Sequence, residues 1–401
     1  MLAPSPSIPV PSQTRAIVLL AVAGFASQAM VRSTDSLLPQ IAADFGVTVG
    51  AASIVVSAYS VMHGSMQLVS GPVGDRVGKY RMIAIATAFC AVVVFACGLT
   101  ASLPMLLAAR VASGIGAAWI IPLGMAYIGD VVPYDRRQRV LGRYMSGQII
   151  GQLFGQAAGG VIGDAFGWRT VFFVLAGLFA AAALGLAREL KVNPLTREPS
   201  RSPATLASVV ADYRRILGSS WVRVMLLAVF LEGAFMFGAF AYVGADLHGR
   251  FGLNFTLVGL VIGTFGIGGL IYAVFVRQLF ARFGEIGLAG YGAVTLGIAY
   301  LMLAVAPVWW ATPAAVMMIG LGFYMLHNTL QTNATQMAPD ARATGVCLFS
   351  AALYIGQPVG VSLVAPVVDR FGARPAFFMA GVLLPALGLW FAGRLAHRKQ
   401  V

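Results

Sequence analysis

Long apolar runs alternate along this chain with short polar, Gly-containing or Pro-containing connections. Each run predicts a membrane-spanning helix, because about 20 mostly apolar residues cross the hydrocarbon core of a bilayer. The pattern predicts twelve spans in two sets of six. They lie at residues 16–38, 50–72, 81–101, 104–131, 141–163 and 168–188, and then at 221–244, 254–276, 286–306, 309–336, 343–366 and 375–394.

The two sets define the predicted domains. We expect a cytoplasmic tail at 1–15, an N-terminal six-helix bundle at 16–188, a polar cytoplasmic linker at 189–220, a C-terminal six-helix bundle at 221–394 and a cytoplasmic tail at 395–401. The first tail is rich in Pro and Ser and has no basic start, so it is interpreted as a tail and not as a cleaved signal.

Composition supports a membrane protein. Of 401 residues, 59% are hydrophobic and only 10% are charged, whereas soluble domains carry about a quarter charged residues. The net charge of +13 does not indicate a nucleic-acid partner, because the basic residues lie between apolar runs. Cytoplasmic connections of membrane proteins retain excess Lys and Arg. On the predicted outer side the basic residues are few: Arg169, Arg250, Arg370 and Arg374. Both termini are therefore predicted to be cytoplasmic, in a multi-pass protein of the cell inner (plasma) membrane.

The two halves repeat one another. Phe45-Gly46 returns as Phe251-Gly252, and Pro133 returns as Pro339. A longer match at nearly the same offset joins Asp164, Phe166, Gly167 and Arg169 to Asp369, Phe371, Gly372 and Arg374. Parallel six-helix repeats are typical of transporters that bind substrate at the repeat interface.

The connection after the second run carries a recognisable motif, Gly71-Pro-Val-Gly-Asp-Arg-Val-Gly-Lys79. It resembles the loop signature of the major facilitator superfamily, with Tyr80 in place of a second basic residue. The resemblance implies a conformational latch made by Gly71, Asp75, Arg76, Gly78 and Lys79. A solvated charged loop is the alternative interpretation. The second-half equivalent has Arg277 and Ala281 where Gly and Asp are expected, which predicts an asymmetric latch.

Charged residues inside the spans are candidates for proton coupling, because a charge in hydrocarbon costs several kcal/mol unless it has a partner or faces water. Arg110 begins a segment that resembles a second signature of the family. By that resemblance Asp35 is expected to contact Arg110, with Arg32 as a competing partner one helical turn from Asp35. The alternatives are that Arg110 extends to the outer surface and that Asp35 is an interfacial residue.

The fifth run places glycines four residues apart. Gly151, Gly155 and Gly159, followed by Gly160, predict a groove for a closely packed helix. The pattern also resembles the antiporter signature of exporters in the family, although Gln156 stands where that signature has Pro. Ordinary helix packing remains the alternative.

The second half has one deep acid, Glu232, which is a candidate for binding a proton or a cation. A protonated acid bonded to a neighbouring helix is the alternative. Further polar side chains are predicted to contact substrate in a central cavity, and packed hydrogen-bonding groups are the alternative for the two histidines among them. These candidates are Arg32, Tyr59, His63, Gln67, Tyr242, His327, Asn328 and Gln331.

We therefore expect an all-α membrane protein with twelve transmembrane helices in two pseudo-symmetric six-helix bundles, the major facilitator fold. The expected function is secondary active transport, the proton-coupled export of a small, partly apolar solute by alternating access. An importer or facilitator of the same fold and a non-transporting membrane receptor are the alternatives. No metal-ligand cluster, nucleophile elbow or phosphate loop is found in the sequence, so no enzyme activity, catalytic residue, metal or cofactor is expected. The protein is expected to be monomeric, with the lipid bilayer, a small-molecule substrate and protons as its partners.

Overall fold

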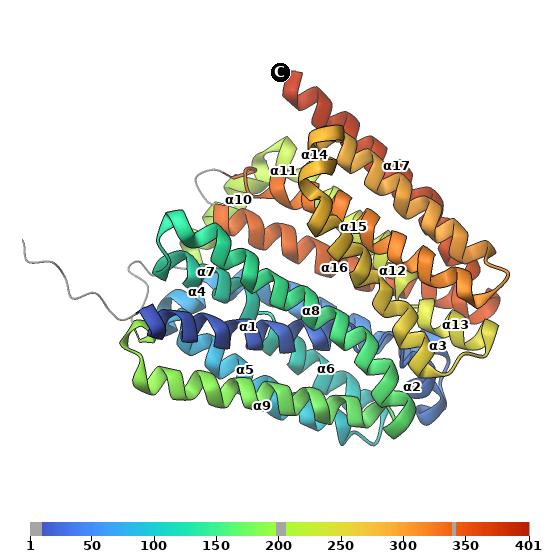
Figure 1. The fold of residues 1–401 in the computed structure, drawn as a ribbon, viewed down its shortest axis with the longest axis horizontal. Coiled ribbons are helices and arrows are strands. Elements are labelled where there is room, and N and C mark those ends of the chain that lie inside the picture. The colour runs from blue at the N-terminus through green and yellow to red at the C-terminus, as the bar shows by residue number, and fades with distance from the viewer. Residues whose placement is uncertain (1–9, 198–205, 339–341, 401) are drawn as a thin grey trace, which may run out of the picture.

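The computed structural model describes residues 10–197, 206–338 and 342–400, and in these ranges it contains helices and no strand. The first half forms the lower bundle in Figure 1. Its helices are α1 (Val10–Arg32), α2 (Leu38–Phe45), α3 (Val49–Ala52), α4 (Ile54–Val77), α5 (Lys79–Gly98), α6 (Leu103–Ala117), α7 (Ile120–Val131), α8 (Tyr134–Phe166) and α9 (Trp168–Val192).

The second half forms the upper bundle in Figure 1 and follows a linker that contains η1 (Pro194–Thr196) and α10 (Leu206–Gly218). Its elements are α11 (Ser220–Glu232), the π-helical turn η2 (Gly233–Phe237), α12 (Gly238–Phe240), α13 (Val243–Phe251), α14 (Phe255–Val305), η3 (Trp309–Ala311), α15 (Thr312–Ala334), α16 (Arg342–Phe371) and α17 (Arg374–Gln400).

The described residues contain twelve crossings, as the apolar pattern predicts. Ten described helical segments are long and apolar enough to span a membrane. One of them, α14, holds two crossings, because its backbone leaves the helical conformation at Gly284. The twelfth crossing is α8, which has 33 residues but a more polar composition. The predicted fourth span is divided at Ala118 into α6 and α7.

The internal repeat is also present in the backbone. In the described part of the chain six glycines have a positive φ, a conformation that costs little only for Gly, and each lies where a helix ends or breaks. They fall in three pairs separated by 206, 206 and 205 residues, which are Gly46 with Gly252, Gly78 with Gly284, and Gly167 with Gly372. Each half also has its own large cluster of buried apolar side chains. The halves are therefore two similar bundles, each with a separate core.

Glycines bring one helix pair in each half into close contact. A Cβ at Gly151 or Gly155 of α8 would overlap the carbonyl groups of Phe25 and Ala29 in α1. Their counterparts Gly356 and Gly360 of α16 face the carbonyl groups of Phe230 and Ala234 in the same way. Small residues at this spacing allow backbones to approach closely.

The other two glycines of the α8 stripe face different neighbours. Gly159 faces the carbonyl of Ser33, whereas Gly160 faces Phe255 and Gly259 of the other half.

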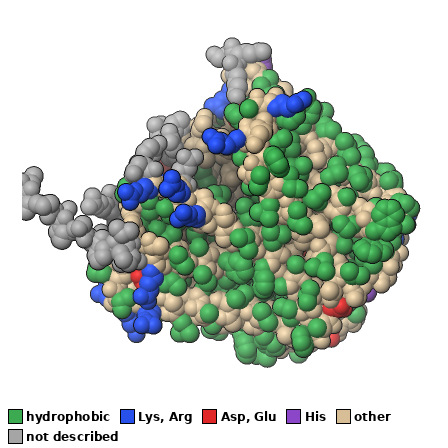
Figure 2. Space-filling model, in the orientation of Figure 1, with side chains coloured by type: hydrophobic (Ala, Val, Ile, Leu, Met, Phe, Trp, Pro, Cys, Tyr) green, Lys and Arg blue, Asp and Glu red, His purple; other side chains and the backbone are tan. Residues whose placement is uncertain are grey.

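The bundle has two chemically different ends. The start of α1, the end of α17 and α10 lie toward the left and top of Figure 1, and α2, α3 and α13 lie at the right. We call the first the basic end and the second the opposite end. At the basic end, Arg15 and Arg197 contact the last residues of α9, and Lys79 and Arg137 contact the end of α7. Between them, many large apolar side chains are exposed, as expected for a lipid-facing surface; Val92, Leu184 and Leu363 each exceed 70% exposure. Figure 2 shows this mostly apolar face.

Candidate functional site

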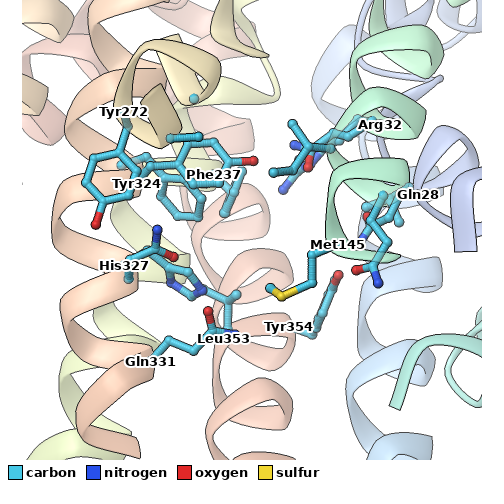
Figure 3. A pocket seen from close by; sticks show the side chains of 18 of the residues that line it. Gln28, Arg32, Met145, Phe237, Tyr272, Tyr324, His327, Gln331, Leu353 and Tyr354 are labelled. Carbon is cyan, nitrogen blue, oxygen red and sulfur yellow. The ribbon is translucent and has the colours of Figure 1, made fainter. Parts of the chain in front are cut away.

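A cavity of about 390 Å³ lies between the two halves. In Figure 3, Arg32 and Gln28 of α1 face Tyr272, Tyr324 and His327 of the second half across it. The described lining is mostly aromatic and amide-bearing. It includes Gln28, Arg32, Met145, Gln148 and Gln152 from the first half, and Phe237, Tyr272, Phe323, Tyr324, His327, Asn328, Gln331, Leu353, Tyr354 and Gln357 from the second.

Arg32 joins the two halves at this cavity. α1 ends at Arg32, and the chain then turns so that one guanidinium nitrogen lies 3.3 Å from a carboxylate oxygen of Asp35. A second nitrogen donates to Oε1 of Gln357 at 2.7 Å, and the guanidinium carbon lies 3.9 Å from the ring centroid of Phe237. Asp35 is fully buried, and its Oδ1 has no hydrogen-bond partner among the described residues.

Asp35 does not form the expected pair with Arg110. Its carboxylate pairs instead with Arg32, which lies one turn away on the same chain segment. Arg110 instead lies 4.5 Å from the ring centroid of Tyr59, and its Nε donates to the carbonyl of Val55 at 3.3 Å. Both Arg110 and Asp35 are fully buried, so neither reaches the surface.

Glu232 contacts a residue of a neighbouring helix, which is the contact that the alternative interpretation of the sequence expected. Its Oε2 lies 2.8 Å from Nδ1 of His327, across helices α11 and α15. Glu232 is fully buried at the start of the π-helical turn, a distortion that is frequent at functional sites. The imidazole of His327 lines the cavity and stacks on Phe323 with centroids 4.8 Å apart. Nothing in the sequence spacing links these two residues.

The predicted substrate contacts divide into two groups. Arg32, His327, Asn328 and Gln331 line the cavity, whereas four others are absent from its described lining: Tyr59, His63, Gln67 and Tyr242. Nδ1 of His63 lies 3.2 Å from the Tyr59 hydroxyl, and the hydroxyl of Tyr242 donates to the carbonyl of Val361.

Sequence reasoning missed several polar side chains of the lining, including Gln28, Gln148, Gln152, Tyr354 and Gln357. One signal was available. Gln148 and Gln152 are four residues apart, directly beside Gly147 and Gly151, so they share a helix face next to the glycine stripe.

The predicted latch is described only in part. The side chains of Asp75 and Arg76, together with Gly71, lie outside the described residues. Gly78 ends α4 with a φ of 91°, and Lys79 pairs with Asp130 at the end of α7, at 2.6 Å.

The two halves are joined at the opposite end by two carboxylates, one from each repeat. Asp164 of α8 accepts hydrogen bonds from the backbone N–H groups of Phe255 and Thr256 at the start of α14. Asp369 of α16 accepts from the hydroxyl of Thr48 and the backbone N–H of Gly50.

These contacts fix the side on which the cavity lies. Along α8 the cavity residues Met145 to Gln152 come before Asp164, and along α14 Tyr272 comes after Phe255. The cavity therefore lies between these cross-half contacts and the basic end. Figure 2 shows the surface hollowed beside Lys and Arg side chains at that end.

Comparisons with known proteins cover nearly the whole chain. A sequence model described as Major Facilitator Superfamily matches residues 20–361. The uncharacterized MFS-type transporter YceJ of Bacillus subtilis is 27% identical over 88% of this chain and 91% of its own length. A chloramphenicol resistance protein of Streptomyces lividans is 26% identical, covering 94% of this chain and 95% of that protein. Multidrug resistance protein 1 of Bacillus subtilis is 26% identical, covering 90% and 92%.

Solved structures show the same fold. A mutant of the nucleoside transporter NupG aligns with a TM-score of 0.76 at 12% identity, over 94% of this chain and 99% of that one. A mutant of the peptide transporter POT in complex with alafosfalin aligns with a TM-score of 0.77 at 13% identity, over 97% and 99%.

Proposed function

Because the chain belongs to the major facilitator superfamily and is therefore a multi-pass membrane transporter and not an enzyme, we propose that it exports a small, partly apolar solute in exchange for protons. The observation that carries this proposal is the cavity between the repeats, which both halves line and which the cross-half contacts of Asp164 and Asp369 close at the opposite end. A site at a repeat interface with one closed end is one state of an alternating-access cycle.

Export as the direction is supported by the relatives. Two proteins that align over nearly their full length are named for chloramphenicol resistance and multidrug resistance. We propose that the basic end is cytoplasmic, because Lys and Arg concentrate in cytoplasmic connections. The cavity would then face the cytoplasm, from which an exporter loads its solute. The proposed location is the plasma membrane, with the protein acting as a monomer.

Proton coupling is proposed to use the two buried acid pairs. Asp35 with Arg32 and Glu232 with His327 each place a carboxylate beside a cationic or titratable partner at the cavity. Protonation neutralises a carboxylate and weakens its bond to the basic partner, and where that partner also bonds across the halves, as Arg32 does to Gln357, protonation changes a contact between them. Asp35 is the first candidate, because the Arg32 that it holds also bonds across the halves to Gln357. Arg110 supplies a second buried positive charge in the same half.

The loop after α4 is proposed to act as the latch of the opposite conformation. Asp75 with Arg76 and Lys79 would hold the basic end closed when the opposite end opens. Asp75→Asn is therefore expected to slow transport while leaving solute affinity in detergent unchanged.

Transport measurements test this proposal. Cells that lack their main exporters should accumulate less chloramphenicol when they make this protein, and collapsing the proton gradient should remove the difference. A protein with Asp35→Asn, present at the same level in the membrane, is the matched control and should not lower accumulation. A panel of other small amphipathic antibiotics extends the test. If no compound's accumulation falls, or if accumulation rises, export is wrong and import becomes the better interpretation.

A further inference from the structure

Basic side chains lie at the surface of the cavity, and the acidic side chains that pair with them lie behind that surface. Two pairs of an acidic and a basic side chain lie beside it, and in each pair the basic residue lines the cavity while the acidic residue is completely buried behind it. Arg32 and His327 are lining residues, whereas Asp35 and Glu232 have 0% exposure. No Asp or Glu is among the described residues that line this cavity. A bound molecule therefore meets hydrogen-bond donors, and no carboxylate from those residues.

Protein groups already cover two of the aromatic rings around the cavity. Aromatic faces often bind cationic ligands, but at these two rings a basic side chain of the protein occupies that position. The guanidinium of Arg32 lies 3.9 Å from the centroid of Phe237, and the imidazole of His327 stacks on Phe323 at an angle of 15°. A cation entering this site would compete with these groups and lie near the charge of Arg32.

The remaining lining suits a flat molecule that carries oxygen acceptors. Gln28, Gln148 and Gln152 present amide groups from the first half, while Tyr272 and Tyr324 present rings and hydroxyl groups from the second. Arg32 has five N–H donors, of which Asp35 and Gln357 accept from two. A volume of about 390 Å³ accommodates a molecule of one or two fused rings with substituents.

We propose, building on the function proposed above, that the solute is a neutral or anionic aromatic compound with an oxygen acceptor that bonds to Arg32, and that permanent cations are excluded. Quaternary ammonium compounds are therefore not among the proposed solutes. It concerns the same cavity, but it does not depend on the coupling ion.

Three probes of nearly the same shape test the assignment: 2-naphthamide, 2-naphthalenesulfonate and 2-naphthyltrimethylammonium. Their affinities for the purified full-length protein in detergent are measured by equilibrium dialysis with naphthalene fluorescence. The amide and the sulfonate should each bind at least about tenfold more tightly than the ammonium compound, because placing like charges together costs several kcal/mol. Equal or tighter binding of the ammonium compound, or no binding of any probe, overturns the proposal.

Variants assign the preference to Arg32. Arg32→Gln should reduce the ratio of affinities to less than about threefold, and Arg32→Lys should retain most of it. Arg250→Gln is the matched control, because Arg250 also pairs with an acid, Asp246, at 2.7 Å but is outside the cavity lining. That variant should keep the native ratio. If Arg32→Gln does not fold, the ranking of the native protein still decides the proposal. Cells in which this protein exports only quaternary cations would refute the solute class while leaving the export function intact.

Discussion

Asp369 and Gly50 are 319 residues apart in sequence, yet a carboxylate oxygen of Asp369 accepts a hydrogen bond from the backbone N–H of Gly50 at 2.8 Å. Gly50 has no side chain, and a Cβ there would collide with that carboxylate. Asp164, the repeat equivalent of Asp369, bonds to the first N–H groups of α14. Each acid thus satisfies the exposed N–H groups at a helix start in the other half, where negative charge is also favoured.

Removing these two acids should open the opposite end. Each cap is worth about 1 kcal/mol, and such a change shifts a two-state population by about fivefold. The double variant Asp164→Asn, Asp369→Asn should therefore increase the alkylation rate of a cysteine placed at Ser53, which is 2% exposed, by several-fold. The measurement uses a background without the native cysteines Cys90, Cys97 and Cys347.

Asp44→Asn is the control for that experiment. Asp44 lies at the same end but pairs with Arg169 of its own half at 2.6 Å. Its removal should leave the alkylation rate at Ser53 unchanged. If the double variant behaves like this control, the two acids do not hold the halves together.

Replacing a glycine of α8 should lower stability only where that glycine faces another helix. A Cβ at Gly155 would overlap the carbonyl of Ala29, so Gly155→Ala forces α1 and α8 apart and should cost about 1–3 kcal/mol. Gly142, on the same helix, has nothing within 4 Å of a built Cβ, so Gly142→Ala should be neutral or slightly stabilising. The apparent Tm of the two proteins in detergent provides the comparison. Equal Tm values would show that the close approach contributes little.

Coupling should depend on Asp35 and Arg32 as one unit. In everted vesicles with an acidic interior, Asp35→Asn should abolish gradient-driven accumulation while still allowing downhill exchange. Arg32→Ala should also impair accumulation, and the double variant should be little worse than either single variant, because the residues contact each other. If Asp35→Asn accumulates solute at the native rate, Glu232→Gln is the next variant to test.

The orientation in the membrane can be tested by labelling. A cysteine at Ala207 in α10 should resist a membrane-impermeant thiol reagent in intact cells, whereas one at Gly249 in α13 should react. Both positions are exposed, so accessibility in the folded protein does not distinguish them. After the cells are opened, both should react. Labelling of Ala207 in intact cells would reverse the proposed topology.

The number of helices, their approximate positions and the internal repeat could be read from the sequence. These features follow from local rules, because twenty apolar residues form a helix in lipid whatever surrounds them. The positions of the glycines with positive φ are also set by a local rule. Gly46 and Gly252 end α2 and α13, and only Gly adopts that backbone without cost, so the repeat was visible in the positions of such residues.

The pairing of charges was decided only by the tertiary structure. Asp35 was within reach of both Arg32 and Arg110 by depth, and the turn after α1 selected Arg32. Glu232 and His327 are 95 residues apart, and Arg32 and Gln357 are 325 apart. A hydrogen bond depends on side-chain positions to within a few tenths of an ångström, which the packing of helices fixes and the hydrophobic pattern does not.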